Sequence, residues 1–283
     1  MRASLLSFVL AGVAAACSIE PAPSSSGSPA PSSSVEPGDD VDPVESDGGS
    51  PGKDAGAKDG STTQPEACTP SEILGTLSGS CGIVRTLLTS PSPSFEKNAL
   101  VFVGGETYDK ASLSDGGDTI YDTPNAGGSS VESEVMSFEV LHGCECATLL
   151  KTETQIAYYP AEGGPASITD ILVKIDGKNV GVSVTRAYKP SNQSYPDTDV
   201  KALLEKKLEG INVSSARVKP ADKWVKQILH VFTANKAASD AVARVLPTID
   251  ASLRSNTIVL LTQTTGGGFI YCNPDPALGS ECP

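Results

Sequence analysis

The side chains that could do chemistry centre on Asp170, which follows Thr169 at the start of an apolar run. Ser183 and Thr185 alternate with valines along a later run, and a strand there would turn both hydroxyls to one face. Mg²⁺ prefers hard anionic oxygens, so one carboxylate beside two hydroxyls is a poor cage for it. Three glutamates could complete such a site: Glu134, Glu139 and Glu153.

Two interpretations of this group stay open. In the first, Asp170, Ser183 and Thr185 form a degenerate site that binds a ligand without cleaving it, and no cofactor is expected. In the second, they are polar positions on a half-exposed sheet face. An active site with Mg²⁺ at Asp170 would also need a cation, from Lys174 or Arg186, and alternation sends Arg186 off the Ser183 face.

The elements that must position these residues follow from periodicity, capping residues and turn signals. A strand is expected at Ala99–Val103, and after it the order is helix, three strands, helix, strand, helix, strand. The first helix starts from Ser129 and carries Val131, Val135, Phe138 and His142 at helical spacing. The three strands are expected at Leu149–Tyr159, Ile168–Ile175 and Val180–Ala187.

The second half of this pattern contains the remaining two helices and two strands. A helix with Val200, Leu204 and Leu208 on one face is expected to stop at Gly210. Ile228–Thr233 and Ile258–Leu261 are expected as strands, the latter central and covered on both faces, with a helix at Ala237–Leu246 between them. The sequence therefore predicts an α/β domain.

This order, with an Asp on the second strand, resembles the core of the PD-(D/E)XK nuclease superfamily. The blocks that carry the resemblance are Lys151–Thr154, Thr169-Asp170, Gly181–Arg186 and Trp224–His230. The resemblance implies a restriction-endonuclease-like core: helix, three-stranded meander, helix, strand, helix, strand. Active members carry Glu-x-Lys on the third strand, where this chain has Ser183 and Thr185. It therefore implies a degenerate, uncharacterised branch that binds rather than cleaves; the alternative is a divergent metal-dependent nuclease or phosphodiesterase.

The N-terminus predicts export. Met1-Arg2 precedes an apolar run from Leu5 to Ala16 that is too short to span a bilayer, as in a signal peptide. Ala14-Ala15-Ala16-Cys17 resembles the lipobox of bacterial lipoproteins. That resemblance implies a lipid-modified (palmitate-bearing) Cys17 and an anchor in a bacterial membrane, expected to be the outer membrane. The alternative is an ordinary signal peptide with a stray thiol at Cys17.

Composition divides the rest of the chain. We expect a signal peptide at 1–16 and a disordered linker at 17–67, rich in Ser, Pro, Gly and Asp, which cannot bury enough apolar area to fold. An N-terminal extension at 68–128 should precede a nuclease-like core at 129–271 and a tail at 272–283.

Six cysteines remain after Cys17, an even number that predicts disulfides in an exported chain. The sequence does not determine their pairing. A Cys68–Cys81 disulfide would close a plausible local loop, and Cys272 or Cys282 is expected to bond the C-terminal tail to the rest of the domain. His142-Gly143-Cys144-Glu145-Cys146 could suggest a metal site, but disulfides are favoured in an oxidising compartment. The six are Cys68, Cys81, Cys144, Cys146, Cys272 and Cys282.

The net charge of −13 does not suit a nucleic-acid partner, because phosphate contacts dominate such affinity. No glycine-rich phosphate loop or His-Glu-x-x-His pattern occurs in the sequence. The expected function is that of a lipid-anchored envelope protein with a non-catalytic, nuclease-like domain that binds or scaffolds. Its partners would be the membrane and an unknown envelope or extracellular ligand; a structural envelope component is the other possibility.

Overall fold

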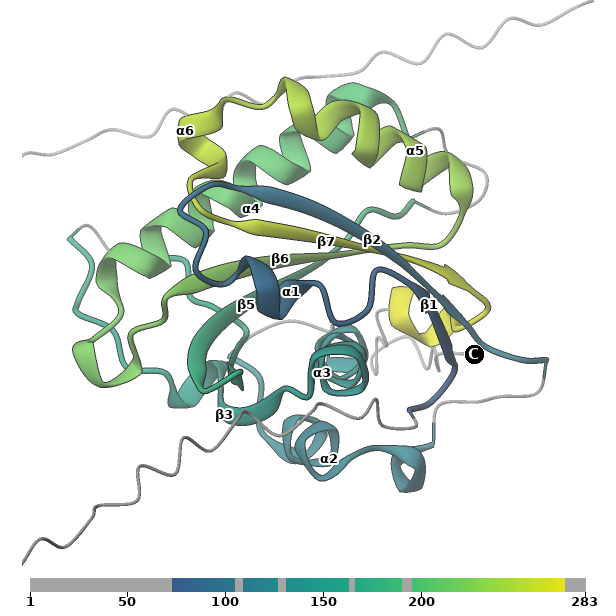
Figure 1. Ribbon diagram of the computed structural model, residues 1–283, viewed down its shortest axis with the longest axis horizontal. Coiled ribbons are helices and arrows are strands. Elements are labelled where there is room, and N and C mark those ends of the chain that lie inside the picture. Colours follow the sequence, from purple (N-terminus) through teal and green to yellow (C-terminus); the bar gives the residue numbers. More distant parts are fainter. Residues whose placement is uncertain (1–72, 105–108, 127–130, 163–165, 190–194, 273–283) are drawn as a thin grey trace, which may run out of the picture. The chain divides into compact units, whose positions relative to one another are not determined.

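The computed structural model describes residues 73–104, 109–126, 131–162, 166–189 and 195–272 (Figure 1). The predicted signal peptide, Cys17 and the linker lie outside these residues. So do Cys68, Ser129 and Cys282. Within the described residues, no helix has both the length and the apolar character needed to cross a membrane.

One seven-stranded sheet, in the order β1-β2-β7-β6-β5-β4-β3, forms the centre of the described residues (Figure 1). Its middle strands β2, β7, β6 and β5 run parallel, and β1, β4 and β3 pair antiparallel at the two edges. The strands are β1 Thr76–Gly79, β2 Ser94–Val101, β3 Thr148–Thr152, β4 Ile171–Ile175, β5 Lys178–Arg186, β6 Lys226–Thr233 and β7 Ile258–Thr265.

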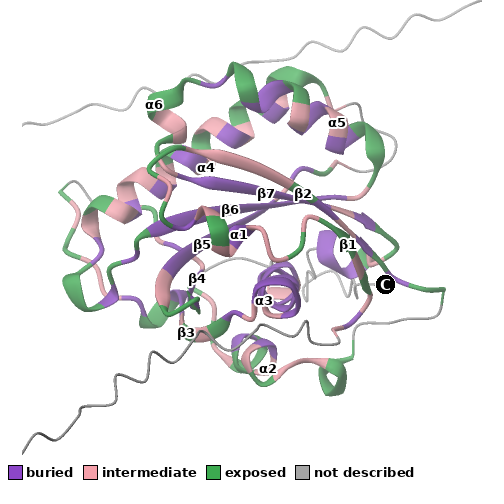
Figure 2. Cartoon of the chain, in the orientation of Figure 1, coloured by how far each residue is buried: buried purple, intermediate pink, exposed green. Residues whose placement is uncertain are grey.

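Helices cover both faces of this sheet (Figure 1). On one face lies α3, with α2 packed outside it, and on the other lie α4, α5 and α6. Each face has its own apolar cluster, one that includes Val135 and Phe138 and one that includes Leu204 and Val242. The central strands and α3 are therefore buried, as Figure 2 shows. The helices are α1 Val84–Leu87, α2 Asp115–Asp122, α3 Val131–Glu145, α4 Asp197–Arg217, α5 Lys236–Val245 and α6 Ala251–Arg254.

The mixed α/β class and the order of elements are confirmed. After β2 and the helix α2, which the sequence did not predict, the chain forms α3, the meander β3-β4-β5, then α4, β6, α5, the short α6 and β7. Both helices between the parallel strands lie on the same face, which is what right-handed crossovers between neighbouring strands require. The residues before α3 are not separate from this sheet, because β2 pairs with β7 along its whole length and carries β1 on its other side.

Several element boundaries differ from the prediction. The first strand, for example, is β2 Ser94–Val101 where the sequence predicts Ala99–Val103. β3 ends at Thr152, because Thr152 and Gln155 cap a 3₁₀ turn over Glu153–Gln155. β4 begins at Ile171, so Asp170 lies just before the strand and not on it. Gly210 does not stop α4, which continues to Arg217. The glycine is needed for contact instead, since a Cβ at this position would lie 3.0 Å from the Ser167 hydroxyl oxygen.

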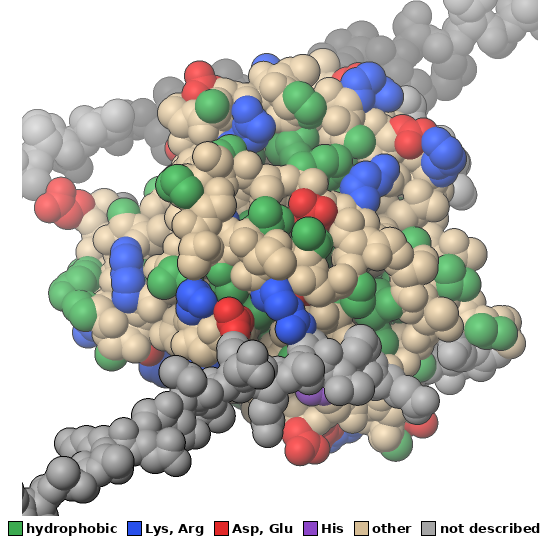
Figure 3. Space-filling model, in the orientation of Figure 1, with side chains coloured by type: hydrophobic (Ala, Val, Ile, Leu, Met, Phe, Trp, Pro, Cys, Tyr) green, Lys and Arg blue, Asp and Glu red, His purple; other side chains and the backbone are tan. Residues whose placement is uncertain are grey.

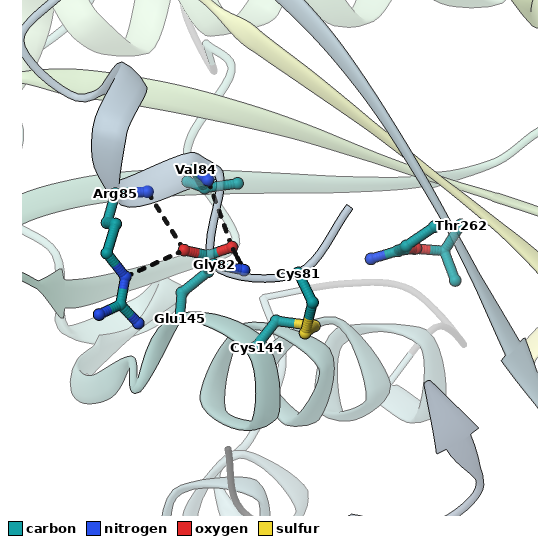
Figure 4. Close-up of a disulfide and its surroundings, with 8 residues drawn as sticks. Cys81, Gly82, Val84, Arg85, Cys144, Glu145 and Thr262 are labelled. Atoms are coloured by element: carbon teal, nitrogen blue, oxygen red, sulfur yellow. Dashed lines mark hydrogen bonds and ion pairs between the residues drawn. A yellow bond between two sulfur atoms is a disulfide. The ribbon is translucent and has the colours of Figure 1, made fainter. Parts of the chain in front are cut away.

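The prediction of disulfides is confirmed, but the proposed Cys68–Cys81 pairing is wrong. Cys81 is bonded to Cys144 on α3, with an S–S distance of 2.04 Å (Figure 4). The loop that follows β1 passes over the end of α3, which brings these cysteines together across 63 residues of sequence. Cys146 and Cys272 are also disulfide-bonded.

We expect the double substitution Cys81→Ser, Cys144→Ser to lower the free energy of unfolding by roughly 4 kcal/mol, because a cross-link closing a loop of this length restricts the unfolded chain. Urea denaturation without reductant would measure the loss. Ser80→Ala, in the same loop, is the matched control and should change little. An unchanged midpoint in the double variant would contradict the prediction.

Candidate functional site

Asp170 lies one residue before β4 and continues the pairing of that strand with β5. Its backbone N–H donates to the carbonyl of Val182 at 3.1 Å, and its carboxylate accepts the N–H of Val184 at 2.5 Å. Burial raises the pKa of this carboxyl to about 6, which the nearby Glu153 charge reinforces and which Lys207 and the Val184 amide oppose. Asp170 therefore loses its charge at a higher pH than an ordinary aspartate does.

Lys207 of α4 is the partner that sequence reasoning missed. Its Nζ donates to the carbonyl of Val184 at 3.0 Å, so Asp170 and Lys207 hold the N–H and the C=O of one residue. Both groups of Val184 would otherwise lack a strand partner on this side, because β4 begins only at Ile171, opposite Val182. The signal in the sequence was a lysine between Leu204 and Leu208 on the apolar face of the helix.

Ser183 and Thr185 are buried. Their side chains lie on the opposite face of β5 from those of Val182 and Val184. Val182 and Val184 join the apolar cluster around α3, so the hydroxyls face the α4 side of the sheet. Arg186 lies off that face, as its position in the strand implies, and donates to the carbonyls of Ile270 and Cys272. Lys174 is exposed on β4.

The three glutamates do not form one cluster with Asp170: Glu153 lies near enough for its charge to raise the pKa of Asp170, but each glutamate has its own hydrogen-bond partner. Glu134 accepts from the Asn125 amide at 3.0 Å, and Glu153 accepts from the backbone N–H of Ala126. Glu139 accepts from the hydroxyl of Ser114 at 2.6 Å and from its N–H at 3.1 Å. Burial raises the pKa of Glu139, although both Ser114 bonds oppose this. Among the described residues there is no group of three or more His, Cys, Asp or Glu side chains placed to hold a metal ion.

Glu145, within the motif His142-Gly143-Cys144-Glu145-Cys146, also binds backbone. Its carboxylate accepts the N–H groups of Gly82, Val84 and Arg85 at 2.8, 3.3 and 3.1 Å (Figure 4). Burial raises the pKa of this carboxyl, whereas these three amides and the Arg85 charge lower it. The motif therefore connects α3 to the loop after β1, through a disulfide and through a carboxylate that accepts backbone N–H groups of that loop.

A cavity of about 480 Å³ opens between α2, α3 and β3. His142 lies in its wall, with its ring stacked on Phe138 and its Nδ1 3.0 Å from the carbonyl of Ala147. Because a carbonyl accepts only, Nδ1 of the neutral ring carries the proton and Nε2 keeps its lone pair. The remaining wall residues are Ser114, Asp115, Gly116, Thr119, Ala147, Thr148, Leu149, Leu150 and Gln155.

A second cavity, of about 440 Å³, lies beyond the carboxyl ends of β5, β6 and β7. Tyr188 and Tyr271 form one wall, with ring centroids 4.9 Å apart. The hydroxyl of Tyr271 is already hydrogen-bonded to Thr264 at 2.9 Å. This cavity has fewer polar groups to offer than the first.

His230 lies in the centre of the molecule and not in a cavity. Its Nδ1 is 2.8 Å from the Ser137 hydroxyl and its Nε2 is 2.7 Å from the Thr262 hydroxyl, which donates to Asn98 Oδ1. Since Thr262 gives its proton to Asn98, Nε2 must donate to Thr262 and Nδ1 must accept from Ser137. Ser137 and His230 are fully buried, so this pair is a core hydrogen-bond chain that no substrate reaches.

Comparison with known proteins finds a relative in Dictyostelium discoideum. No family model matches the chain, and no solved structure matches it. The chain is 42% identical over 166 residues to the Dictyostelium protein called "AAC-rich mRNA clone AAC4 protein", across 56% of this chain and 24% of that protein. The chain therefore spans about a quarter of the length of the curated relative it matches.

The predicted family is wrong. The relative is a eukaryotic protein, and no match supports a bacterial lipoprotein or a branch of the nuclease-like superfamily. The resemblance rested on short motifs that carry little specificity. Asp170 and the Ser183/Thr185 pair occupy the expected region, but Asp170 is engaged with the backbone of Val184.

Replacement of Asp170 by Asn should remove a pH dependence of stability. The pKa of this carboxyl is about 6 in the folded protein and near 3.9 in an unfolded chain. Folding therefore becomes less favourable as the pH rises from 4 to 6, and the full penalty remains above pH 6. The Asn side chain keeps an acceptor for Val184 and has no charge. Relative to wild type, the variant should therefore gain up to ~2 kcal/mol between pH 4 and pH 7.5, measured by urea unfolding. Glu209→Gln, an exposed change on α4, is the control, and parallel pH profiles for Asp170→Asn and wild type would contradict the assignment.

The two histidines should show opposite neutral tautomers in one NMR spectrum. His142 should carry its proton on Nδ1 and His230 on Nε2, which ring ¹⁵N shifts distinguish. Burial lowers the pKa of His230 to about 3, so this ring should stay neutral at pH 4.5. Unfolded histidine protonates near pH 6.5, so the stability that His230 contributes should decline as the pH falls from 6.5 towards 3. The same tautomer at both rings would refute the hydrogen-bond directions assigned to His142 and His230.

Proposed function

We propose that this chain is an exported binding protein whose domain holds a small molecule in the cavity between α2, α3 and β3. The observation that carries the proposal is His142, an imidazole fixed in one tautomer and one orientation in the wall of a cavity of about 480 Å³. Ligand sites in proteins have this size and combine apolar walls with a few placed polar groups. Phe138, Leu149 and Leu150 supply the apolar part.

The engagement of the buried carboxylates supports binding over turnover. Asp170, Glu139, Glu145 and Glu153 each accept at least one backbone N–H. A general acid or base needs its lone pair or proton within reach of a substrate. Carboxylates that hold the backbone in this way contribute to a rigid frame, and a rigid frame favours binding because little order has to be gained when the ligand arrives.

The disulfides support export. All four cysteines of the described residues are in disulfides, and such bonds persist in oxidising compartments. The surface supports a small ligand more than a polyanion. On the face shown in Figure 3, basic and acidic side chains are interspersed and do not form a continuous basic patch of the kind that nucleic acids require.

Thr148→Trp should abolish ligand binding while the domain stays folded. Thr148 is an exposed residue of the edge strand β3 that lines the cavity, so an indole there would occupy the space without disturbing the core. A panel of small aromatic fragments, cationic, neutral and anionic, would be titrated while the His142 ring signals are followed by NMR. Wild type should respond to at least one fragment and Thr148→Trp to none.

The matched control is Ser78→Trp, the same change at an exposed position of β1, the strand at the other edge of the sheet. It should respond to fragments as wild type does. Failure of every fragment to move the His142 signals, or equal responses in Thr148→Trp and wild type, would overturn the proposed function.

A further inference from the structure

The chemistry of the cavity wall restricts its ligand, provided that the cavity binds one as proposed above. Two of its polar groups are hydrogen-bond acceptors. Asp115, at the first position of α2, presents an exposed carboxylate, and His142 keeps a lone pair on Nε2 because Nδ1 is used by the Ala147 carbonyl. Among the described residues of the wall, Asp115 is also the one with a formal charge when His142 is neutral.

Several donors at this end of α2 are already in use. The Ser114 hydroxyl and N–H both donate to Glu139, and the N–H of Gly117 donates to the Ser114 hydroxyl. The Thr119 hydroxyl donates to the carbonyl of Asp115 at 2.8 Å. The Ser114 and Gly117 donors are therefore used within the protein, and Asp115, the first residue of α2, presents a carboxylate at the cavity wall.

The charged side chains near the cavity also favour a cationic ligand. Glu139, whose Oε2 has no hydrogen-bond partner among the described residues, lies next to the wall residue Phe138 in α3. Asp118 and Asp122 of α2 share a single cation, Lys110, at 3.2 and 2.8 Å. Acidic groups thus outnumber basic ones along α2, and a cation that enters the cavity meets a field of favourable sign.

We propose that the cavity binds a small primary amine with an apolar body. The ammonium donates to the Asp115 carboxylate and to Nε2 of His142, and the apolar body packs on Leu149 and Leu150. An ammonium has three donors and no acceptor, which matches a wall with a carboxylate and an imidazole lone pair. The size of the cavity, about 480 Å³, accommodates an aromatic amine.

The test uses three compounds of nearly the same shape: benzylamine, benzyl alcohol and benzoate. Each is titrated into the full-length protein, with the dissociation constant taken from the His142 ring signals. Benzylamine should bind at least about tenfold more tightly than the other two, the difference expected for a charge-assisted hydrogen bond. Asp115→Asn should remove that preference and leave the affinity for benzyl alcohol unchanged.

Glu209→Gln is the control. It removes an exposed carboxylate from α4, on the opposite face of the sheet from the cavity, and should leave the preference within about twofold of wild type. Melting temperatures of both variants guard against loss of the helix. Equal affinities for the three compounds, or a preference that survives Asp115→Asn, would overturn this inference while the cavity remained a ligand site. If none of the compounds gives a response that Thr148→Trp abolishes, the proposed function itself fails.

Discussion

The last turn of α3 is the constraint on which the rest of the described structure depends. Within five residues it places His142 in the cavity wall, Cys144 in the disulfide to Cys81, and Glu145 under the amides of Gly82, Val84 and Arg85. Cys146 then ends the helix in the left-handed region, at φ 51°, and its N–H donates to the carbonyl of His142. The next residue, Ala147, returns its carbonyl to the His142 ring. The geometry of the imidazole, the path of the loop after β1 and the start of β3 are thus set by one turn.

Backbone groups that regular structure leaves unpaired are repeatedly satisfied by buried charged side chains. A buried amide without an acceptor costs roughly 1–3 kcal/mol, so each such carboxylate offsets part of its own desolvation. Lys226 works in the opposite sense, since its buried ammonium donates to the carbonyls of Ser90 and Ser92 and fixes the turn before β2. Desolvation lowers the pKa of this lysine. The same need for backbone partners explains why acidic residues that suggest metal ligands in the sequence are structural in this protein.

The sequence was sufficient for the order of elements but not for the site. Helical spacing of apolar residues identified α3 and α4, and a continuous apolar run identified β7, which is buried on both faces of the sheet. The prediction failed at Gly210, where the contact with Ser167, more than forty residues away, outweighs helix propensity. It also failed for Cys81, whose partner depends on which helix the loop crosses. The cavity could not be predicted from the sequence for the same reason. Its walls α2 and α3 pack closely through Gly116 and Gly117, where a Cβ would overlap Phe138 or Glu139. Only tertiary packing reveals that contact.

α3 connects the cavity to the centre of the sheet, because it is buried on all sides and each face has a different task. Ser137 faces the sheet and starts the chain of hydrogen bonds through His230 and Thr262 to Asn98, which crosses three parallel strands. The next residues, Phe138 and Glu139, face α2 and the cavity. A shift of α3 along the sheet would break the Ser137–His230 bond and leave a fully buried imidazole acceptor unpaired. The polar chain in the core therefore opposes such a shift, and the cavity that carries His142 keeps its shape for the same reason that the sheet keeps its register.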